Sequence, residues 1–135
     1  MKKSLKLIAV AASLTLITGV AVAPSAQAAK KVKLCLALDT GGIDDRSFNA
    51  SAWAGAQSSK VATAEYLPAA SSAEYAPNIK TFVDKGCDLI IGVGYLTTSA
   101  IKDAALANPQ VKFAVIDEVI EGVANAKSIT VQTDQ

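Results

Sequence analysis

Beyond Ala29, the chain alternates short apolar runs with segments in which apolar residues recur every three or four positions. Runs of the first kind predict strands, and spacing of the second kind predicts helices. Strands are predicted over residues 32–38, 63–67, 88–95, 111–116 and 128–132, and helices over residues 47–60, 71–86 and 97–107. This alternation, with continuous apolar strands, predicts an α/β fold: a parallel sheet with helices on both faces.

Several predicted helix ends carry local signals. Asp45 or Ser47 is a candidate N-cap for the first helix. Ser71 and Glu74 have the spacing of a capping box for the second helix. The link over residues 117–127 is short for a helical crossover between parallel strands, which leaves the fifth strand with the weakest support.

The N-terminus has a different pattern. Lys2, Lys3 and Lys6 precede an apolar run over residues 7–22, and a small-residue site ending at Ala28 follows. This order predicts a secretory signal peptide over residues 1–28. The alternative is a transmembrane anchor, but the run is shorter than the roughly 20 residues that span a bilayer. We therefore expect residues 29–135 to be an exported lobe.

Composition excludes several functions. The chain has 13 Lys and Arg against 12 Asp and Glu, and removal of the three lysines of the signal peptide leaves a net charge near −2. No cluster of basic residues indicates nucleic-acid binding. Histidine is absent, which removes the usual general base and the commonest zinc ligand. We expect no enzyme, no cofactor and no metal site.

Two cysteines, Cys35 and Cys87, are present. In an exported protein they could form a disulfide, because that compartment is oxidising. They could equally be two small buried hydrophobic residues. The residues alone leave both interpretations open.

Polar residues follow three of the predicted strands. Asp39 ends the first strand, Gly94-Tyr95 with Thr97-Thr98 follows the third, and Asp117 follows the fourth. In open parallel sheets, ligands bind outside the carboxyl ends of the strands, so these residues are expected at one edge. A carboxylate there could accept hydrogen bonds from paired hydroxyls such as those of a ribose. The alternative is that it binds the amides of its own turn.

Phe48 and Asn49 stand at the start of the first predicted helix, beside that edge. The Phe48 ring could stack on a planar base, and the Asn49 amide could bind a base edge. Alternatively, Phe48 belongs to the core and Asn49 serves the helix N-terminus. Neither residue alone shows whether this edge binds a ligand.

Three segments resemble the basic membrane protein family. They are Asp39-Thr-Gly-Gly-Ile-Asp-Asp-Arg-Ser-Phe-Asn49 with Ser51-Ala-Trp-Ala-Gly55, Cys87-Asp-Leu-Ile-Ile-Gly-Val-Gly-Tyr95, and Phe113-Ala-Val-Ile-Asp117. That family contains substrate-binding proteins of ABC importers, among them purine-nucleoside receptor lipoproteins. The resemblance covers essentially all of residues 29–135.

The resemblance implies a type I periplasmic-binding-protein fold, in which two α/β lobes close on a nucleoside. It implies a strand order of 2-1-3-4-5, which makes the first and third strands neighbours and brings the two cysteine-bearing segments together. Asp39, Phe48, Asn49 and Asp117 would line the cleft. The implied partners are a nucleoside and a membrane-embedded ABC permease, and the protein would be a monomer.

Two features depart from the family pattern. Val20 stands where family members carry a lipobox cysteine, so a lipid anchor is not expected. The chain also ends at Gln135, within the first lobe, and is expected to be an N-terminal fragment. Two other functions stay open: presentation of a ligand to a membrane sensor, and binding of another sugar-like solute.

Overall fold

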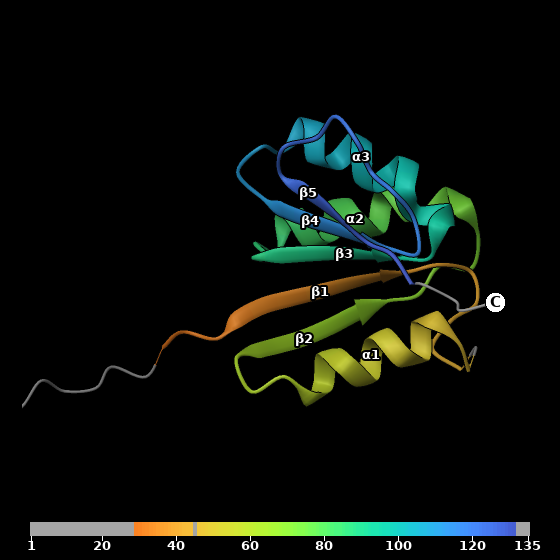
Figure 1. Cartoon of the computed structure of the whole chain (residues 1–135), viewed down its shortest axis with the longest axis vertical. Coiled ribbons are helices and arrows are strands. Elements are labelled where there is room, and N and C mark those ends of the chain that lie inside the picture. The colour runs from red at the N-terminus through yellow and green to blue at the C-terminus, as the bar shows by residue number, and fades with distance from the viewer. Residues whose placement is uncertain (1–28, 45, 132–135) are drawn as a thin grey trace, which may run out of the picture.

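The computed structural model of the protein describes residues 29–44 and 46–131. Five parallel strands form one sheet in the order β2-β1-β3-β4-β5 (Figure 1). The strands are β1 Val32–Leu38, β2 Ala62–Leu67, β3 Leu89–Val93, β4 Lys112–Ile116 and β5 Ala126–Ile129. The helices are α1 Phe48–Ser58, α2 Tyr75–Asp84 and α3 Thr98–Ala107, with 3-10 turns η1 Ser72–Glu74 and η2 Tyr95–Thr97. The expected fold class and strand order are confirmed.

Helices cover both faces of the sheet. In Figure 1, α1 lies beside β2, whereas α2 and α3 lie together on the other side. The residues of β1 alternate between the two layers: Cys35 and Ala37 join the cluster under α2 and α3, and Leu36 and Leu38 join the cluster under α1. Because both faces of β1 are buried from Cys35 to Leu38, this part of the strand is continuously apolar rather than alternating.

The fifth strand begins at Ala126, two residues before the predicted start, and pairs in parallel with β4. The nine residues between these strands contain no helix. The Asn125 side chain, whose Nδ2 lies 2.9–3.0 Å from three carbonyl oxygens at the end of α3 and the start of β4, holds this link instead. These bonds anchor the last residue of the link to the turn between α3 and β4.

The cap predictions are partly correct. The Ser47 hydroxyl accepts a hydrogen bond from the Phe48 amide at the start of α1, whereas Asp45 lies outside the described residues. The Ser71 side chain makes no cap hydrogen bond, so this half of the predicted capping box is wrong. The Glu74 carboxylate instead accepts from the Ala70 amide at 3.0 Å. The 3-10 turn η1 precedes α2, which changes the position of Ser71 relative to the helix.

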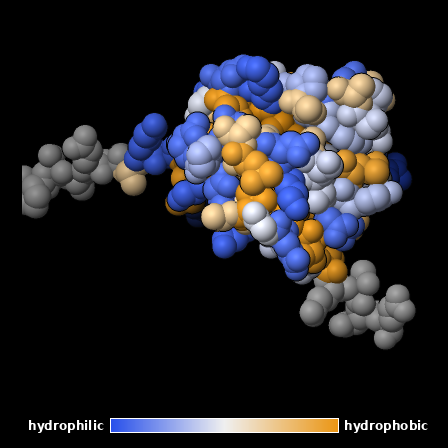
Figure 2. Space-filling model, turned by 90° about the horizontal axis from the view of Figure 1, so that it is seen from above, coloured by the Kyte–Doolittle hydropathy of each residue, from blue (hydrophilic) through white to orange (hydrophobic). Residues whose placement is uncertain are grey.

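The edge strand β5 leaves apolar side chains exposed. Figure 2 shows hydrophobic surface among hydrophilic regions on the face seen from above. Val119 in the β4–β5 link is 54% exposed, and Ile129 in β5 is 45% exposed. Within the part of the chain that the structure describes, no further strand pairs with β5.

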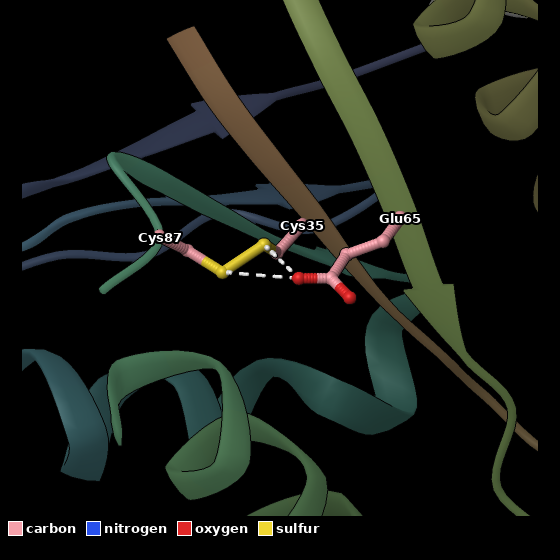
Figure 3. Close-up of side chains that lie close together, drawn as sticks. All are labelled: Cys35, Glu65 and Cys87. Carbon is pink, nitrogen blue, oxygen red and sulfur yellow. Dashed lines mark hydrogen bonds between the residues drawn. A yellow bond between two sulfur atoms is a disulfide. The ribbon is translucent and has the colours of Figure 1, made fainter. Parts of the chain in front are cut away.

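Cys35 and Cys87 form a disulfide that ties the middle of β1 to the residue just before Asp88 and β3. Both cysteines are buried. Glu65 in β2 lies beside the bridge, with its Oε1 atom 3.6 Å from the Cys35 sulfur and 3.9 Å from the Cys87 sulfur (Figure 3). A bridged sulfur carries no proton, so these are packing contacts.

Two ammonium groups surround the Glu65 carboxylate. Lys85 Nζ lies 2.8 Å from Oε2, and Lys33 Nζ lies 3.6 Å from Oε1. Cys35, Glu65 and Cys87 have the chemistry of metal ligands, and their ligand atoms lie within 4.8 Å of one another. The group does not suit a cation, because its sulfurs are bonded to each other and two lysines neutralise the carboxylate.

The hydrogen bond from Lys85, together with the charges of Lys85 and Lys33, holds the pKa of Glu65 below its ordinary value of 4.5. A lowered pKa in the folded state means that the ionised side chain stabilises the protein above the unfolded pKa, and that this contribution is lost as the pH falls through the folded pKa. Glu65→Gln is expected to lower the free energy of unfolding at pH 7 by less than about 1 kcal/mol, because solvent screens a side chain that is about one-third exposed.

Urea unfolding at pH 7 and at pH 3 measures this effect. The difference between Glu65→Gln and the unsubstituted protein should shrink at the lower pH. Asp84→Asn is the control, because the Lys80–Asp84 pair is well exposed and should contribute little at either pH. A difference that stayed constant over this pH range would contradict an electrostatic role for Glu65.

Candidate ligand-binding site

Three turns meet at the carboxyl edge of the sheet because β1, β3 and β4 are aligned there. The aligned residues at this end are Leu38, Val93 and Ile116. The residues that follow them are Asp39, Gly94 and Asp117. Gly94 therefore lies between the two aspartates, on the edge where open parallel sheets bind ligands.

Hydrogen bonds hold the Asp39 carboxylate in place. Its Oδ1 atom accepts from the Gly41 amide at 3.0 Å and from Asn49 Nδ2 at 2.7 Å. The first bond belongs to the turn after β1, and the second comes from the start of α1. The structure thus brings Asp39 and Asn49 into direct contact, an interaction that the sequence analysis did not predict.

The two residues at the start of α1 have opposite environments. Phe48 is 37% exposed, whereas Asn49 is 0% exposed. The Phe48 ring is therefore available at the surface, in contrast to the interpretation of this residue as part of the core. The Asn49 side chain is buried against the turn that holds Asp39.

Gly94 was expected at this edge, but its contact with Asp39 was not predicted. Its φ angle is 88°, in the region that favours glycine. A Cβ atom at this position would lie 2.4 Å from Asp39 Oδ2, so the carboxylate packs directly on the glycine backbone. The Gly94 amide also donates to the Ile116 carbonyl at 3.2 Å. A glycine directly after a buried strand, beside an aspartate that ends the neighbouring strand, is the signal that could have identified this contact.

Asp117 also has left-handed backbone geometry, with a φ angle of 71°. Aspartate and asparagine adopt this conformation more readily than most residues. The Asp117 amide donates to the Ile129 carbonyl at 2.9 Å, which ties this turn to β5. Among the described residues, no hydrogen bond joins the Asp117 side chain to Asp39 or Asn49, although it lies at the same edge.

Two hollows of the described structure lie outside the carboxyl edge. Hollows of about 610 Å³ between α2 and α3, and of about 570 Å³ beside β4 and β5, are lined by other residues. Small-molecule sites usually bury most of the ligand surface. These hollows lie away from Asp39 and Asp117.

A parallel α/β layer with a fixed carboxylate and an exposed aromatic ring at its carboxyl edge is typical of a lobe that binds a small molecule. Residues 31–135 match the family of ABC transporter substrate-binding proteins described as PnrA-like. The chain belongs to this family, as the sequence resemblance indicated. The family consists of solute-binding proteins rather than enzymes.

Relatives and solved structures agree with this placement. The chain is 38% identical over 111 residues to the CD4+ T-cell-stimulating antigen of Listeria monocytogenes, a match that covers 76% of this chain and 31% of that protein. It is 33% identical over 106 residues to the ABC transporter nucleoside-binding protein BmpA of Lactococcus lactis, covering 73% and 30% respectively. The chain thus spans about a third of the length of these relatives.

The structure resembles that of ABC transporter system solute-binding proteins from Aeropyrum pernix. The TM-score is 0.64 at 25% identity, over 72% of this chain and 28% of that chain. In the described part of the protein, no helix has the length and apolar character needed to cross a membrane. The predicted signal peptide and Val20 lie outside the described residues.

Proposed function

We propose that residues 29–135 form part of the first lobe of the extracytoplasmic substrate-binding component of an ABC importer, and that the substrate is a nucleoside. The observation that carries this proposal is the fixed Asp39 carboxylate at the carboxyl edge, bonded to Asn49 at the start of α1, where the neighbouring Phe48 is exposed. The name of the Lactococcus relative, a nucleoside-binding protein, supports the same substrate class.

The chemistry of the edge suits a nucleoside. Asp39 can accept hydrogen bonds from the paired ribose hydroxyls, which are donors that an ionised carboxylate binds strongly. The Phe48 ring can stack on the base, a contact worth about 1–3 kcal/mol in nucleic-acid complexes. Asp117 provides a second carboxylate, on the other side of Gly94, for further polar groups of the ligand.

The proposed partner is an ABC permease in the membrane. The protein is exported by the signal peptide over residues 1–28, acts as a monomer and carries no lipid anchor, because Val20 replaces the lipobox cysteine. It binds no nucleic acid, since the mature chain has no basic cluster.

A second function uses the same lobe to present a nucleoside, or another sugar-like solute, to a membrane sensor. The fold and the edge chemistry suit this function equally well, because they determine which ligand is bound and not which membrane protein receives it. Genes for a permease and an ATPase beside this gene would favour transport, whereas a neighbouring sensor gene would favour presentation.

Binding of inosine to residues 29–135 tests the substrate class. Because the chain provides one wall of the cleft, we expect a dissociation constant of about 1 mM or weaker, near −4 kcal/mol. In a titration followed by ¹H–¹⁵N NMR, the amides of Asp39, Phe48, Gly94 and Asp117 should shift. Ribose alone should shift Asp39 but not Phe48, because it lacks the base.

Asp39→Asn should reduce these shifts strongly, and Asp103→Asn is the matched control, since Asp103 lies at the hollow between α2 and α3. Shifts that were absent at this edge, or unchanged in Asp39→Asn, would refute the nucleoside proposal. Binding of inosine with micromolar affinity would refute the expectation that residues 29–135 alone cannot bind a nucleoside tightly.

A further inference from the structure

Asn49 has no surface with which to contact a ligand. It is 0% exposed in this lobe, although the neighbouring Phe48 is exposed. A side chain that binds a cleft ligand directly must be accessible before the ligand arrives. The observed role of the Asn49 amide is a 2.7 Å hydrogen bond to Asp39 Oδ1.

We infer that Asn49 is a positioning residue that acts on the ligand through Asp39, and that Gly94 fixes the same carboxylate from the opposite side. The inference rests on the proposed function, because it takes Asp39 as the acceptor for the ligand. It assigns Asn49 a different role from the two that the sequence left open, which were a base contact and a hydrogen bond at the helix N-terminus.

The two carboxylate oxygens of Asp39 have different surroundings. Oδ1 receives both hydrogen bonds, from Gly41 and from Asn49. Among the described residues, no donor is hydrogen-bonded to Oδ2. Oδ2 is therefore the oxygen that remains for a donor of the ligand. Because the carboxylate is already oriented, binding does not have to order it, which preserves affinity.

Gly94 leaves the space that the Asp39 carboxylate occupies. Any side chain there would place its Cβ 2.4 Å from Oδ2 and 3.1 Å from the Asp39 Cγ. The Gly94 backbone cannot retreat easily, because its amide is bonded to Ile116 and its carbonyl accepts from Thr97 Oγ1 at 2.8 Å. The carboxylate would have to turn away, and Asn49 could no longer reach it.

A double-mutant cycle separates positioning from direct contact. The variants are Asn49→Ala, Asp39→Asn and the combination of both, and the readout is the initial slope of the NMR shifts on titration with inosine. Asn49→Ala should lower the slope about tenfold, the effect of losing a hydrogen bond to a charged group. In the Asp39→Asn background, Asn49→Ala should cause no further loss. If Asn49 contacts the nucleoside directly, the two losses will multiply, and the inference is overturned.

A second variant tests the geometry without any ligand. In Asn49→Asp, the introduced carboxyl is buried and faces Asp39, so desolvation and repulsion between the two carboxylates both raise its pKa; in the Asp39→Asn background only the desolvation remains. A group with a raised folded pKa stabilises the protein at low pH and loses that contribution as the pH rises. Relative to the unsubstituted chain, this variant should therefore become progressively less stable from pH 5 to pH 8 in urea unfolding.

Gln57→Glu is the matched control, because Gln57 is exposed on the same helix and should show no such trend. A flat pH profile for Asn49→Asp would overturn the positioning role even if Asn49→Ala fails to fold. If inosine perturbs nothing in the unsubstituted chain but the pH trend appears and is weaker in the Asp39→Asn background, the substrate proposal fails while the Asn49–Asp39 coupling stands; a trend of equal size in both backgrounds would overturn the coupling.

Discussion

Replacement of both Cys35 and Cys87 by alanine is expected to lower the free energy of unfolding by about 2–4 kcal/mol. The two residues are 52 positions apart, and the chain-entropy relation gives about 4 kcal/mol for a loop of this length. Domains are stable by only about 5–15 kcal/mol in total, so the loss is large. The contribution of the bridge to the free energy of unfolding is large because it joins β1 to the start of β3 and closes a long loop. That loop contains α1, β2 and α2.

Urea unfolding of the oxidised protein, of the reduced protein and of the double variant measures this effect. The reduced protein should be intermediate in stability. Its two thiols regain protons and can donate to the Glu65 carboxylate, which lies 3.6 Å from one sulfur and 3.9 Å from the other. If the double variant unfolds at the same urea concentration as the oxidised protein, the bridge does not stabilise the fold.

Phe82→Ala is expected to be similarly destabilising, by about 3–5 kcal/mol. Phe82 is 0% exposed and belongs to the cluster that α2, α3 and the sheet enclose. Removal of its ring deletes buried apolar surface and leaves a cavity that the surrounding strands cannot close. The loss should appear as a lower urea midpoint with an unchanged slope.

Phe48→Ala is the matched control, since it removes the same ring from a position that is 37% exposed. It should cost less than about 1 kcal/mol of stability and should reduce the response to inosine. Equal destabilisation by both substitutions would mean that Phe48 belongs to the core, which would remove the stacking surface from the proposed site.

The larger features of the fold were predictable from the chain because they depend on local patterns. Continuous apolar runs predicted the strands, and helical spacing predicted α1, α2 and α3 within a few residues. The start of β5 was misplaced because Ala126 and Lys127 do not form an apolar run. Their strand conformation depends on pairing with Phe113 and Ala114, a contact between distant parts of the chain.

The site was predictable in location but not in its internal contacts. A strand followed by an aspartate was enough to place Asp39 and Asp117 at the carboxyl edge, since all parallel strands end there. The sequence did not predict which of Phe48 and Asn49 is buried. Adjacent residues in a helix point in different directions, and the orientation of the helix decides which one is buried. In this protein α1 turns Asn49 towards Asp39 and leaves Phe48 at the surface.

The sequence by itself determined the α/β class, the order of elements along the chain, the family and the edge where polar side chains gather. The class, the order of elements and the edge follow from residue type and spacing, which are local properties, and the family follows from the resemblance of three segments to known members. The tertiary structure decided that Cys35 and Cys87 are bonded, that Gly94 packs against Asp39, and that the β4–β5 link needs no helix. These features depend on distances between segments far apart in the sequence, and such distances exist only after the sheet has assembled.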